Sequence, residues 1–350
     1  MKLGKIYLLN LMKTFDIGGT ERSTIIYSNH LVKKIGKVFI IAPKGFYNRI
    51  KIISEEVKVF NFKYKLGYNP LTFFINLFFL SKVIRNEKIN VINYHQRILL
   101  PYIFFIKFFF KKIKIIYTGH AVFYDSINKF LTADIFIAIS NAVKNDFIKA
   151  NKKNIYLIKH GIEINTNIAA ENSTVEYFGF VGRFTEGKGI ITLLYAFKLF
   201  HQRNQNQKII FRGEGNLQNK MENFIAENSL EDFILIKKPE ENINKIFDKI
   251  DVLIFPSEIE EGFGLVILEA MSRNIAIIKS YWDKDEEFFN DKTCFLFEPK
   301  NVNELVEKME EVVLNSEKRK KLLQNSKGLV KEHFDINRFM DEYLKLLSEI

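Results

Sequence analysis

Residues 256–272 read PSEIEEGFGLVILEAMS and directly follow the apolar run VLIF at 252–255, which predicts a buried strand. The pattern predicts a strand, a glycine-containing loop and a helix that begins near Leu265. Glu261 lies in this loop, and Glu269 follows about one helical turn inside the helix. Because glycine lets the backbone approach a ligand and the first amides of a helix donate to phosphate oxygens, the stretch predicts an anion-binding loop between two carboxylates. An exposed glutamate before an ordinary helix is the alternative interpretation.

A second stretch, FVGRFTEGKGIITLLYAF at 180–197, begins inside another predicted strand and continues into a helix. It places Arg183 and Lys188 five residues apart on a loop that also contains three glycines. Two cations on a flexible loop can clamp a diphosphate and neutralise the charge that grows on it as it leaves. A chance pair of surface cations is the alternative, but the position of this loop before the glutamate motif favours a diphosphate site.

Together, the two stretches resemble the motifs of the retaining GT-B glycosyltransferases of family 4. In that family seven residues separate two glutamates, and Ala-Met follows the second, as Ala270 and Met271 do here. The resemblance implies that the two cations bind the donor diphosphate and that the two glutamates hold sugar and ribose hydroxyls. The site residues that it implies are Glu261, His120, Arg183 and Lys188 for catalysis, and Gly18, Gly19, Gly213, Gly215, Gly264, Leu265 and Glu269 for donor binding.

Three further loops extend the resemblance over most of the chain. DIGGTER at 16–22 resembles the family's N-terminal diglycine loop, and it lacks the G-x-G-x-x-G pattern, which argues against a dehydrogenase. His120, in YTGHAVF at 117–123, follows a predicted strand, where the family places a histidine against the donor sugar. FRGEGNLQNKM at 211–221 resembles the loop near the nucleotide base. For each loop taken alone, a flexible turn or a structural histidine is the alternative.

Three other polar residues stand beside predicted strand ends. His160, in KHGIE, resembles the stretch that ends the first domain of the family, and we expect it to have a structural or hinge role. His95 and Arg97 follow the strand predicted at 91–94, and we expect them to line the acceptor cleft.

Apolar runs alternate with helical patterns along the chain, which predicts βα units and parallel sheets. Strands are predicted over 5–10, 38–42, 57–60, 91–94, 114–118, 135–139, 155–158, 177–181, 208–212, 234–237, 252–255 and 275–279. Helices are predicted over 20–34, 141–149, 189–203, 216–227, 242–249, 265–272, 302–314, 316–332 and 336–350. The expected fold is α/β of the GT-B type, with two Rossmann-like, doubly wound domains facing a central cleft.

The length of 350 residues exceeds what one hydrophobic core usually organises and indicates two domains. The polar, non-periodic stretch 163–176 is the expected hinge. It separates an acceptor-side domain over 1–165 from a nucleotide-sugar-binding domain over 166–335. The last helix, 336–350, is expected to pack back on the first domain.

Charge is distributed unevenly. Residues 1–168 carry 27 Lys and Arg against 9 Asp and Glu, whereas residues 169–350 carry 25 against 32. The basic half indicates a polyanionic partner, which can be nucleic acid, anionic lipid or a phosphorylated substrate, although a Lys-rich genome would give the same surface. Basic residues flank the aromatic segments 73–79 and 102–110, and this favours peripheral binding to an anionic membrane surface over two purely internal segments.

Several patterns are missing. Cys294 is the only cysteine, the N-terminal stretch lacks a signal-peptide pattern, and no apolar run reaches the length of a spanning helix. We therefore expect a cytoplasmic protein, peripheral at the inner face of the cytoplasmic membrane. Because the six histidines are scattered and Cys294 stands alone, we expect neither a metal nor another cofactor.

The resemblance implies a retaining, metal-independent hexosyltransferase. We expect it to move a sugar from a nucleotide-sugar donor, with UDP as the nucleotide, to a lipid-linked glycan in surface-polysaccharide or lipopolysaccharide biosynthesis. A GT-B sugar-nucleotide epimerase is the enzymatic alternative, since it uses similar sheets and diphosphate contacts. A non-enzymatic nucleic-acid-binding protein is the other alternative, but the sequence shows no dense basic stretch or nucleic-acid-binding motif.

Overall fold

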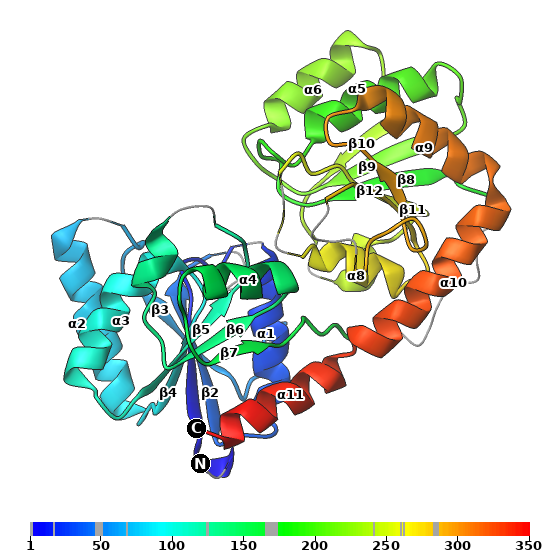
Figure 1. Cartoon of the computed structure of the whole chain (residues 1–350). Helices are drawn as coiled ribbons and strands as arrows, with labels where there is room; N and C mark the ends of the chain where they lie inside the picture. The colour runs from blue at the N-terminus through cyan, green and yellow to red at the C-terminus, as the bar shows by residue number, and fades with distance from the viewer. Residues whose placement is uncertain are drawn as a thin grey trace. The chain divides into compact units, whose positions relative to one another are not determined.

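The computed structural model describes residues 3–16, 18–45, 52–67, 69–123, 126–164, 174–240, 242–259, 261, 263–282 and 287–350. The chain divides into two compact units (Figure 1). We call Met1–Gly161 with Ile336–Ile350 the N-terminal unit, and Ile162–Asp335 the C-terminal unit. The chain therefore passes between the units twice. Of the stretch predicted as a hinge, residues 165–173 lie outside the described residues.

Within the described residues, seven parallel strands form the sheet of the N-terminal unit. They are β1 (Tyr7–Leu11), β2 (Lys37–Pro43), β3 (Lys58–Phe62), β4 (Val91–Tyr94), β5 (Lys114–Gly119), β6 (Ile135–Ala138) and β7 (Ile155–Leu157). Their order is β3-β2-β1-β4-β5-β6-β7, and Leu8 in β1 pairs with both Val38 and Val91. The central strands are apolar on both faces because helices cover both sides of the sheet.

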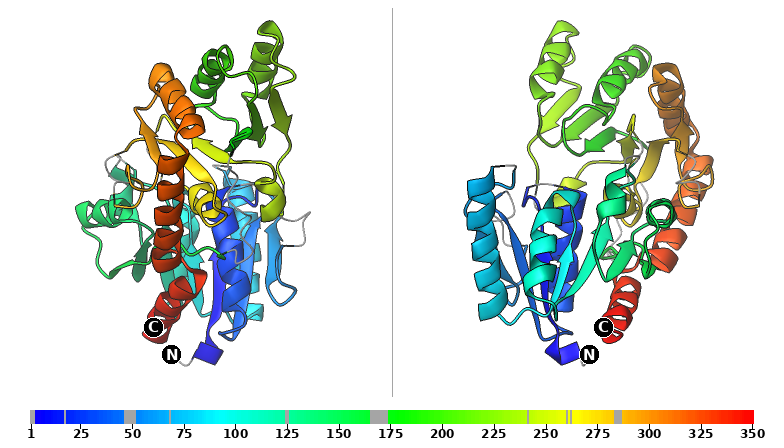
Figure 2. Two further views of the ribbon diagram at one scale, coloured as in Figure 1. Left: turned by 90° about the vertical axis from the view of Figure 1, so that its right-hand side faces the viewer. Right: turned by 60° about the vertical axis from the view of Figure 1, so that its left-hand side comes forward.

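Two helices, α1 (Gly19–Leu31) and α11 (Ile336–Ser348), cover one face of this sheet. The rings of Tyr27 in α1 and Phe339 in α11 stack with centroids 3.7 Å apart. The other face is covered by α2 (Pro70–Asn86), α3 (Leu100–Phe109) and α4 (Asn141–Lys149), which Figures 1 and 2 show beside the same strands. The last helix of the chain thus completes the core of the first unit.

The helices α2 and α3 lie at the two aromatic segments, 73–79 and 102–110, for which the sequence patterns predicted neither a helix nor a strand. Local signals explain both starts: the Asn69 side chain accepts hydrogen bonds from the amides of Leu71 and Thr72, and a proline occupies the first turn of each helix. Apolar residues on all sides hid the helical period. None of the helices in the described ranges is both long and apolar enough to cross a membrane.

The C-terminal unit contains a parallel sheet in the order β10-β9-β8-β11-β12-β13, six strands within the described residues. The strands are β8 (Tyr177–Val181), β9 (Lys208–Arg212), β10 (Ile234–Lys237), β11 (Val252–Phe255), β12 (Ala276–Ser280) and β13 (Phe295–Phe297). The helices are α5 (Ile190–His201), α6 (Gln218–Glu227), α7 (Ile243–Ile246), α8 (Leu265–Met271), α9 (Val302–Leu314) and α10 (Ser316–His333). Short 3-10 helices in the other unit span Leu3–Lys5, Arg97–Leu99 and Ser126–Phe130.

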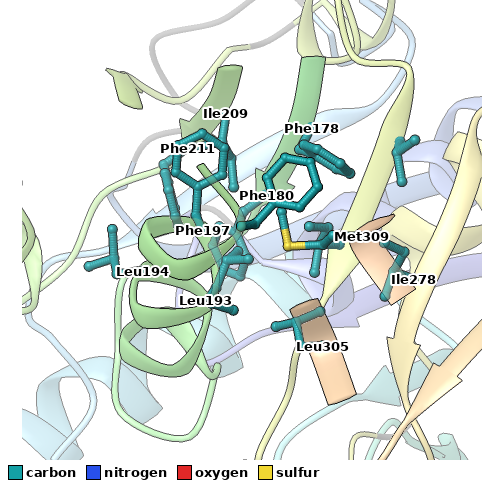
Figure 3. Close-up of a cluster of buried hydrophobic side chains, with 14 of the residues drawn as sticks. Phe178, Phe180, Leu193, Leu194, Phe197, Ile209, Phe211, Ile278, Leu305 and Met309 are labelled. Carbon is teal, nitrogen blue, oxygen red and sulfur yellow. The ribbon is translucent and has the colours of Figure 1, made fainter. Parts of the chain in front are cut away.

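An aromatic core joins the second sheet to α5 and α9. Phe178, Phe180 and Phe211 project from β8 and β9 toward Phe197 and Leu193 of α5 (Figure 3). All of these side chains are buried. This packing makes the C-terminal unit a complete domain with its own core.

Each sheet reverses its strand order at one place, between β1 and β4 in the first unit and between β8 and β11 in the second. The loops that leave these strands at their carboxyl ends diverge to opposite faces of the sheet. Open α/β sheets bind ligands at such a point. The predicted pair of doubly wound, parallel sheets is thereby confirmed, and two loop-lined edges are identified as places for ligands.

The role of α11 gives a stability prediction. Phe339→Ala is expected to lower the unfolding free energy of the N-terminal unit by about 3–5 kcal/mol, because the buried ring leaves a cavity against Tyr27. Lys345→Ala, at an exposed position of the same helix, serves as the control and should change it by less than about 0.5 kcal/mol. Amide hydrogen exchange in β1 reports on this unit, and fluorescence of Trp282, the single tryptophan, reports on the other. Equal protection of β1 in the two variants contradicts the prediction.

Candidate active site

Three loops at the carboxyl ends of β8, β9 and β11 contact one another through their backbones. Gly189 has φ +69°, and a Cβ there would lie 1.8 Å from the carbonyl oxygen of Pro256. The amide of Glu258 donates to the carbonyl of Gly187 over 2.8 Å. Only glycine allows this approach, so the loop that carries Lys188 is held against the loop that leads to Glu261.

The predicted base-side glycines, Gly213 and Gly215, lie on the loop after β9. A Cβ on Gly213 would lie 1.9 Å from the carbonyl oxygen of Gly182, and one on Gly215 would lie 2.3 Å from that of Phe184. The Phe184 amide also donates to the carbonyl of Glu214 over 2.8 Å. These glycines therefore hold the loop after β9 against the loop that contains Arg183.

Lys188 and Glu261 form an ion pair. The Lys188 ammonium nitrogen lies 2.6 Å from both carboxylate oxygens of Glu261, and each side chain is 20% exposed. The hydroxyl of Ser257 donates to Glu261 Oε1 over 2.8 Å. The sequence predicted separate contacts of these two residues with a ligand, whereas the structure shows them bound to each other.

This ion pair is suited to being opened. Each side chain keeps a fifth of its surface exposed, so both charged groups can be reached from solvent. Ser257, which the sequence patterns did not single out, holds the carboxylate from its other side.

Arg183 is exposed on the loop after β8. In the described part of the chain we find no ion pair to its guanidinium. It is therefore a second cation on the loop of Lys188, with its charge open to solvent.

The helix α8 carries the second predicted glutamate. Gly264, with φ +77°, precedes the helix, Leu265 is its first residue, and Glu269 is 8% exposed within it. The guanidinium of Arg273 donates to the Glu269 carbonyl over 2.9 Å. The helix thus begins where the sequence predicted, and it buries most of the Glu269 side chain.

In the N-terminal unit, polar side chains converge at the carboxyl ends of β1, β4 and β5. Asn10, Asn93, Thr118, His95 and His120 face a small cavity of about 20 Å³, and α1 and α11 complete its wall. Thr118 donates to Asn93 over 2.9 Å, and Asn93 donates to the hydroxyl of the α11 residue Tyr343 over 3.2 Å. The cavity has room for about one water molecule, so the side chains bond mainly to one another.

A chain of hydrogen bonds assigns the proton on His120. Ser28 donates to the Thr24 carbonyl over 2.7 Å, so its oxygen accepts from the Asn10 amide nitrogen at 3.0 Å. The Asn10 carbonyl then accepts from His95 Nε2 at 3.3 Å. A neutral His95 therefore has a bare Nδ1, which accepts from His120 Nε2 at 2.9 Å. His120 in turn keeps Nδ1 as a hydrogen-bond acceptor.

Three histidines in this region are held neutral. Burial lowers the pKa of His120 to about 3. Burial first, and then the neighbouring His120 and His160, lower the pKa of His95 well below its ordinary value. Burial, His120 and the Arg338 cation do the same for the pKa of His160. Since His120 keeps more exposed surface than the other two, which are buried, His95 and His160 are the more firmly neutral.

His160 connects this region to the last helix. Its ring stacks on that of His120 with centroids 5.6 Å apart, and its Nδ1 is hydrogen bonded to the hydroxyl of Tyr27. Arg338 of α11 donates to the carbonyls of Lys159 and His160 over 2.7 and 3.3 Å. These contacts agree with the structural role expected for His160.

The diglycine loop is arranged differently from the expectation. Gly18 caps α1 with an extended backbone, and a Cβ on it would lie 2.3 Å from a carboxylate oxygen of Glu21. Glu21 is 7% exposed. The carboxylate of Glu21 thus lies at the helix start where Gly18 and Gly19 were expected to favour an anion, and the sequence patterns did not identify it.

His95 and Arg97 do not line an open cleft together. His95 is 5% exposed and lies behind His120, so it supports the neighbouring ring. The guanidinium of Arg97 lies 3.5 Å from the centroid of the Phe123 ring. The expectation failed for His95 because the burial of a residue just past a strand end depends on the helices that cover it, here α1 and α11.

No group of three or more histidine, cysteine or acidic side chains suited to a metal ion is found among the residues that the structure describes. Lys188, Arg183 and Glu261 are among the charged residues on the loops at the switch point of the second sheet.

The two parallel, doubly wound sheets are those of the GT-B fold, and comparison with known proteins identifies the family. Residues 17–166 match the model of Glycosyltransferase Family 4, and residues 162–329 match that of Glycosyl transferases group 1. The chain therefore belongs to the group 1 glycosyltransferases.

Relatives and solved structures extend this comparison. An uncharacterised glycosyltransferase of Methanocaldococcus jannaschii is 31% identical over 57% of this chain and 55% of its own. A Campylobacter jejuni alpha-1,4-N-acetyl-D-galactosaminyltransferase, whose name includes GalNAc-alpha-(1->4)-GalNAc-alpha-(1->3)-diNAcBac-PP-undecaprenol, is 25% identical over 97% of this chain and 98% of its own. Anabaena HepE, solved with UDP and glucose, has a TM-score of 0.82 at 18% identity and covers 98% of this chain and 99% of its own.

The neutral histidines predict a pH-dependent stability. Below about pH 6.5 the unfolded chain binds protons that the folded histidines do not, so the unfolding free energy should fall as the pH is lowered from 7.5 to 4.5. Each histidine contributes up to about 1.4 kcal/mol per pH unit. His95→Gln should reduce the slope of unfolding free energy against pH by about the contribution of one histidine. Hydrogen exchange in β1 and β4 measures this slope.

The control for this experiment is Tyr343→Phe. It removes a hydroxyl from the same buried cluster without removing a group that gains a proton in this pH range. It should lower stability at every pH and leave the slope unchanged. A His95→Gln variant with the parental slope shows that the His95 ring is not held neutral.

Proposed function

We propose that this chain transfers a sugar, with retention of configuration, from a UDP-sugar to a lipid-linked glycan during surface-polysaccharide assembly. The observation that carries the proposal is the Lys188–Glu261 pair at the switch point of the second sheet, held by glycine-packed loops. The Campylobacter relative named with an undecaprenol-linked glycan supports the class of acceptor. The UDP and glucose bound in Anabaena HepE support the class of donor.

In the proposed reaction the donor diphosphate displaces Glu261 from Lys188. The ammonium, with Arg183 as a second cation, then neutralises the charge that develops on the diphosphate as the glycosidic bond breaks. The freed Glu261 carboxylate accepts hydrogen bonds from hydroxyls of the transferred sugar, and Glu269 accepts from the ribose. Donor binding thus replaces a protein ion pair by two contacts with the substrate.

His120 contributes a hydrogen-bond acceptor. With its Nε2 proton donated to His95, its Nδ1 can accept only from an O–H or N–H group of a ligand. A sugar hydroxyl meets that requirement and a deprotonated phosphate oxygen does not. Retention follows from attack on the donor face that the diphosphate leaves, with a phosphate oxygen taking the acceptor proton and no covalent sugar on Glu261.

We propose in addition that the chain works at the inner face of the cytoplasmic membrane without spanning it. The excess of basic residues in 1–168 and the lipid-linked acceptor support this location.

Transfer of sugar from UDP-sugars to a polyprenyl-diphosphate glycan tests the proposal. The double variant Arg183→Ala/Lys188→Ala should lower kcat at saturating donor by at least about 100-fold, because the leaving diphosphate loses both cations. Lys320→Ala removes an exposed cation from α10 of the same unit and should leave kcat unchanged. Parental turnover in the double variant rejects the diphosphate site, and an epimerised donor without transfer points to an epimerase.

Metal independence is tested separately. We expect the transfer rate to be unchanged in excess EDTA, because the cations of Lys188 and Arg183 supply the charge that a divalent ion supplies elsewhere. The rate should be measured before and after chelation and after adding Mg²⁺ or Mn²⁺. A rate lost in EDTA and restored by either ion disproves this part of the proposal.

A further inference from the structure

The helices α2 and α3 expose an apolar stripe. Their rings contact one another along the pair, with centroids of Phe73 and Tyr102 4.5 Å apart. Six large apolar side chains nevertheless point to solvent, each at least 50% exposed: Leu71, Phe74, Phe78, Phe104, Phe108 and Phe109. Along α2 the three exposed residues follow one another at spacings of three and four, which places them on one side of the helix. A surface of this kind marks an interaction site.

The stripe ends in a cationic groove. An open groove of about 530 Å³ lies where α2 and α3 end, with Phe108 and Phe109 among the residues that line it. Four exposed cations also line it: Arg85, Lys88, Lys111 and Lys112. In the described part of the chain, no ion pair to any of the four is found. The groove therefore combines an apolar wall with unneutralised positive charge.

The exposed apolar stripe and the four cations of the groove together indicate the class of ligand. A free phosphate would satisfy the four cations but would leave the phenylalanines exposed, and an uncharged apolar chain would do the reverse. A lipid with an anionic headgroup satisfies both, because its phosphate binds the cations while its acyl chain covers the stripe. We propose that this groove binds the headgroup of an anionic membrane phospholipid and that the α2–α3 stripe enters the adjacent bilayer.

The proposed lipid site is separate from the reaction site. Lys88 precedes β4 and Lys112 precedes β5, so the groove lies at the amino ends of these strands. His95 and His120 lie at their carboxyl ends. The six residues of β5 separate the two edges by roughly 20 Å. Leu71 lies at the start of α2 and extends the stripe toward the carboxyl edge of the first sheet. A membrane that follows the stripe would therefore run past both the groove and that edge.

This arrangement deepens the proposed function. A flat membrane contact along α2 and α3 would keep the ligand edge of the first sheet next to the bilayer, where a lipid-linked acceptor resides. Use of the groove during transfer rests on the proposed function, whereas its affinity for anionic lipid does not.

Flotation with vesicles tests the groove. The full chain is mixed with phosphatidylcholine vesicles, with and without phosphatidylglycerol, at low and high salt. We expect binding only to the vesicles with phosphatidylglycerol and a loss of binding at high salt. Lys111→Gln/Lys112→Gln should lower the partition coefficient by on the order of 20-fold, since each cation near an anionic surface contributes roughly five-fold.

A matched pair of lysines serves as the control. Lys33→Gln/Lys34→Gln removes the same charge from exposed positions just after α1, on the other face of the sheet, and should reduce binding by less than about two-fold. Phe108→Ser/Phe109→Ser should abolish binding while keeping all four cations. Equal losses in the two lysine variants, or no binding of the parental chain to anionic vesicles, overturns the proposal.

Two further measurements separate the outcomes. Glycerol phosphate at millimolar concentration should not release the protein from vesicles, and release would identify a site for free phosphate instead. Binding of a UDP-sugar, measured by thermal shift in each variant, should equal that of the parental chain. Vesicle binding without any UDP-sugar binding would leave the lipid groove in place and reject the proposed transfer, and the opposite result would reject the groove alone.

Discussion

The backbone contact between Gly189 and Pro256 is the constraint on which the donor side depends. With a carbonyl oxygen 1.8 Å from the position of a Cβ, no other residue type fits at Gly189 without moving one of the two loops. The contact fixes the distance between the segments that carry Lys188 and Glu261, and their ion pair follows from it. The chemistry of this edge therefore depends on the absence of a side chain as much as on the charged groups themselves.

Each unit gathers polar side chains at the switch point of its sheet, but the two sets of side chains differ in charge. At the switch point of the second sheet, glycines bring charged side chains together near solvent. At the switch point of the first, Asn10, His95 and His120 form a neutral hydrogen-bonded series under the cover of α1 and α11. Burial explains the difference, since a charge there would lose its hydration without a counter-ion, whereas amides and neutral imidazoles can satisfy one another.

Sequence patterns predicted much of this fold and part of the site. The bounds of β4 and of β8 to β11 agree with the apolar runs, because strands buried on both faces leave an uninterrupted signal. The strand β13 was not predicted, whereas the equally short β7 was. For α2 and α3, apolar residues on nearly every side concealed the period. The glutamates and cations were found by their loops, but the Lys188–Glu261 pairing, Ser257 and the burial of His95 depend on tertiary contacts that spacing does not encode.

The position of α11 has a consequence for the order of events during synthesis. Residues 336–350 supply Phe339, Tyr343 and Leu347 to the core of the N-terminal unit, and the whole C-terminal unit is translated before them. The first unit to leave the ribosome is thus the one that cannot close its core until the second has been made. A nascent chain at that stage exposes the apolar face of β1 and α1 for roughly 10 to 35 seconds at ordinary elongation rates. During that interval the N-terminal unit is the part of the chain that a chaperone would bind. The C-terminal unit is the first that can fold to completion.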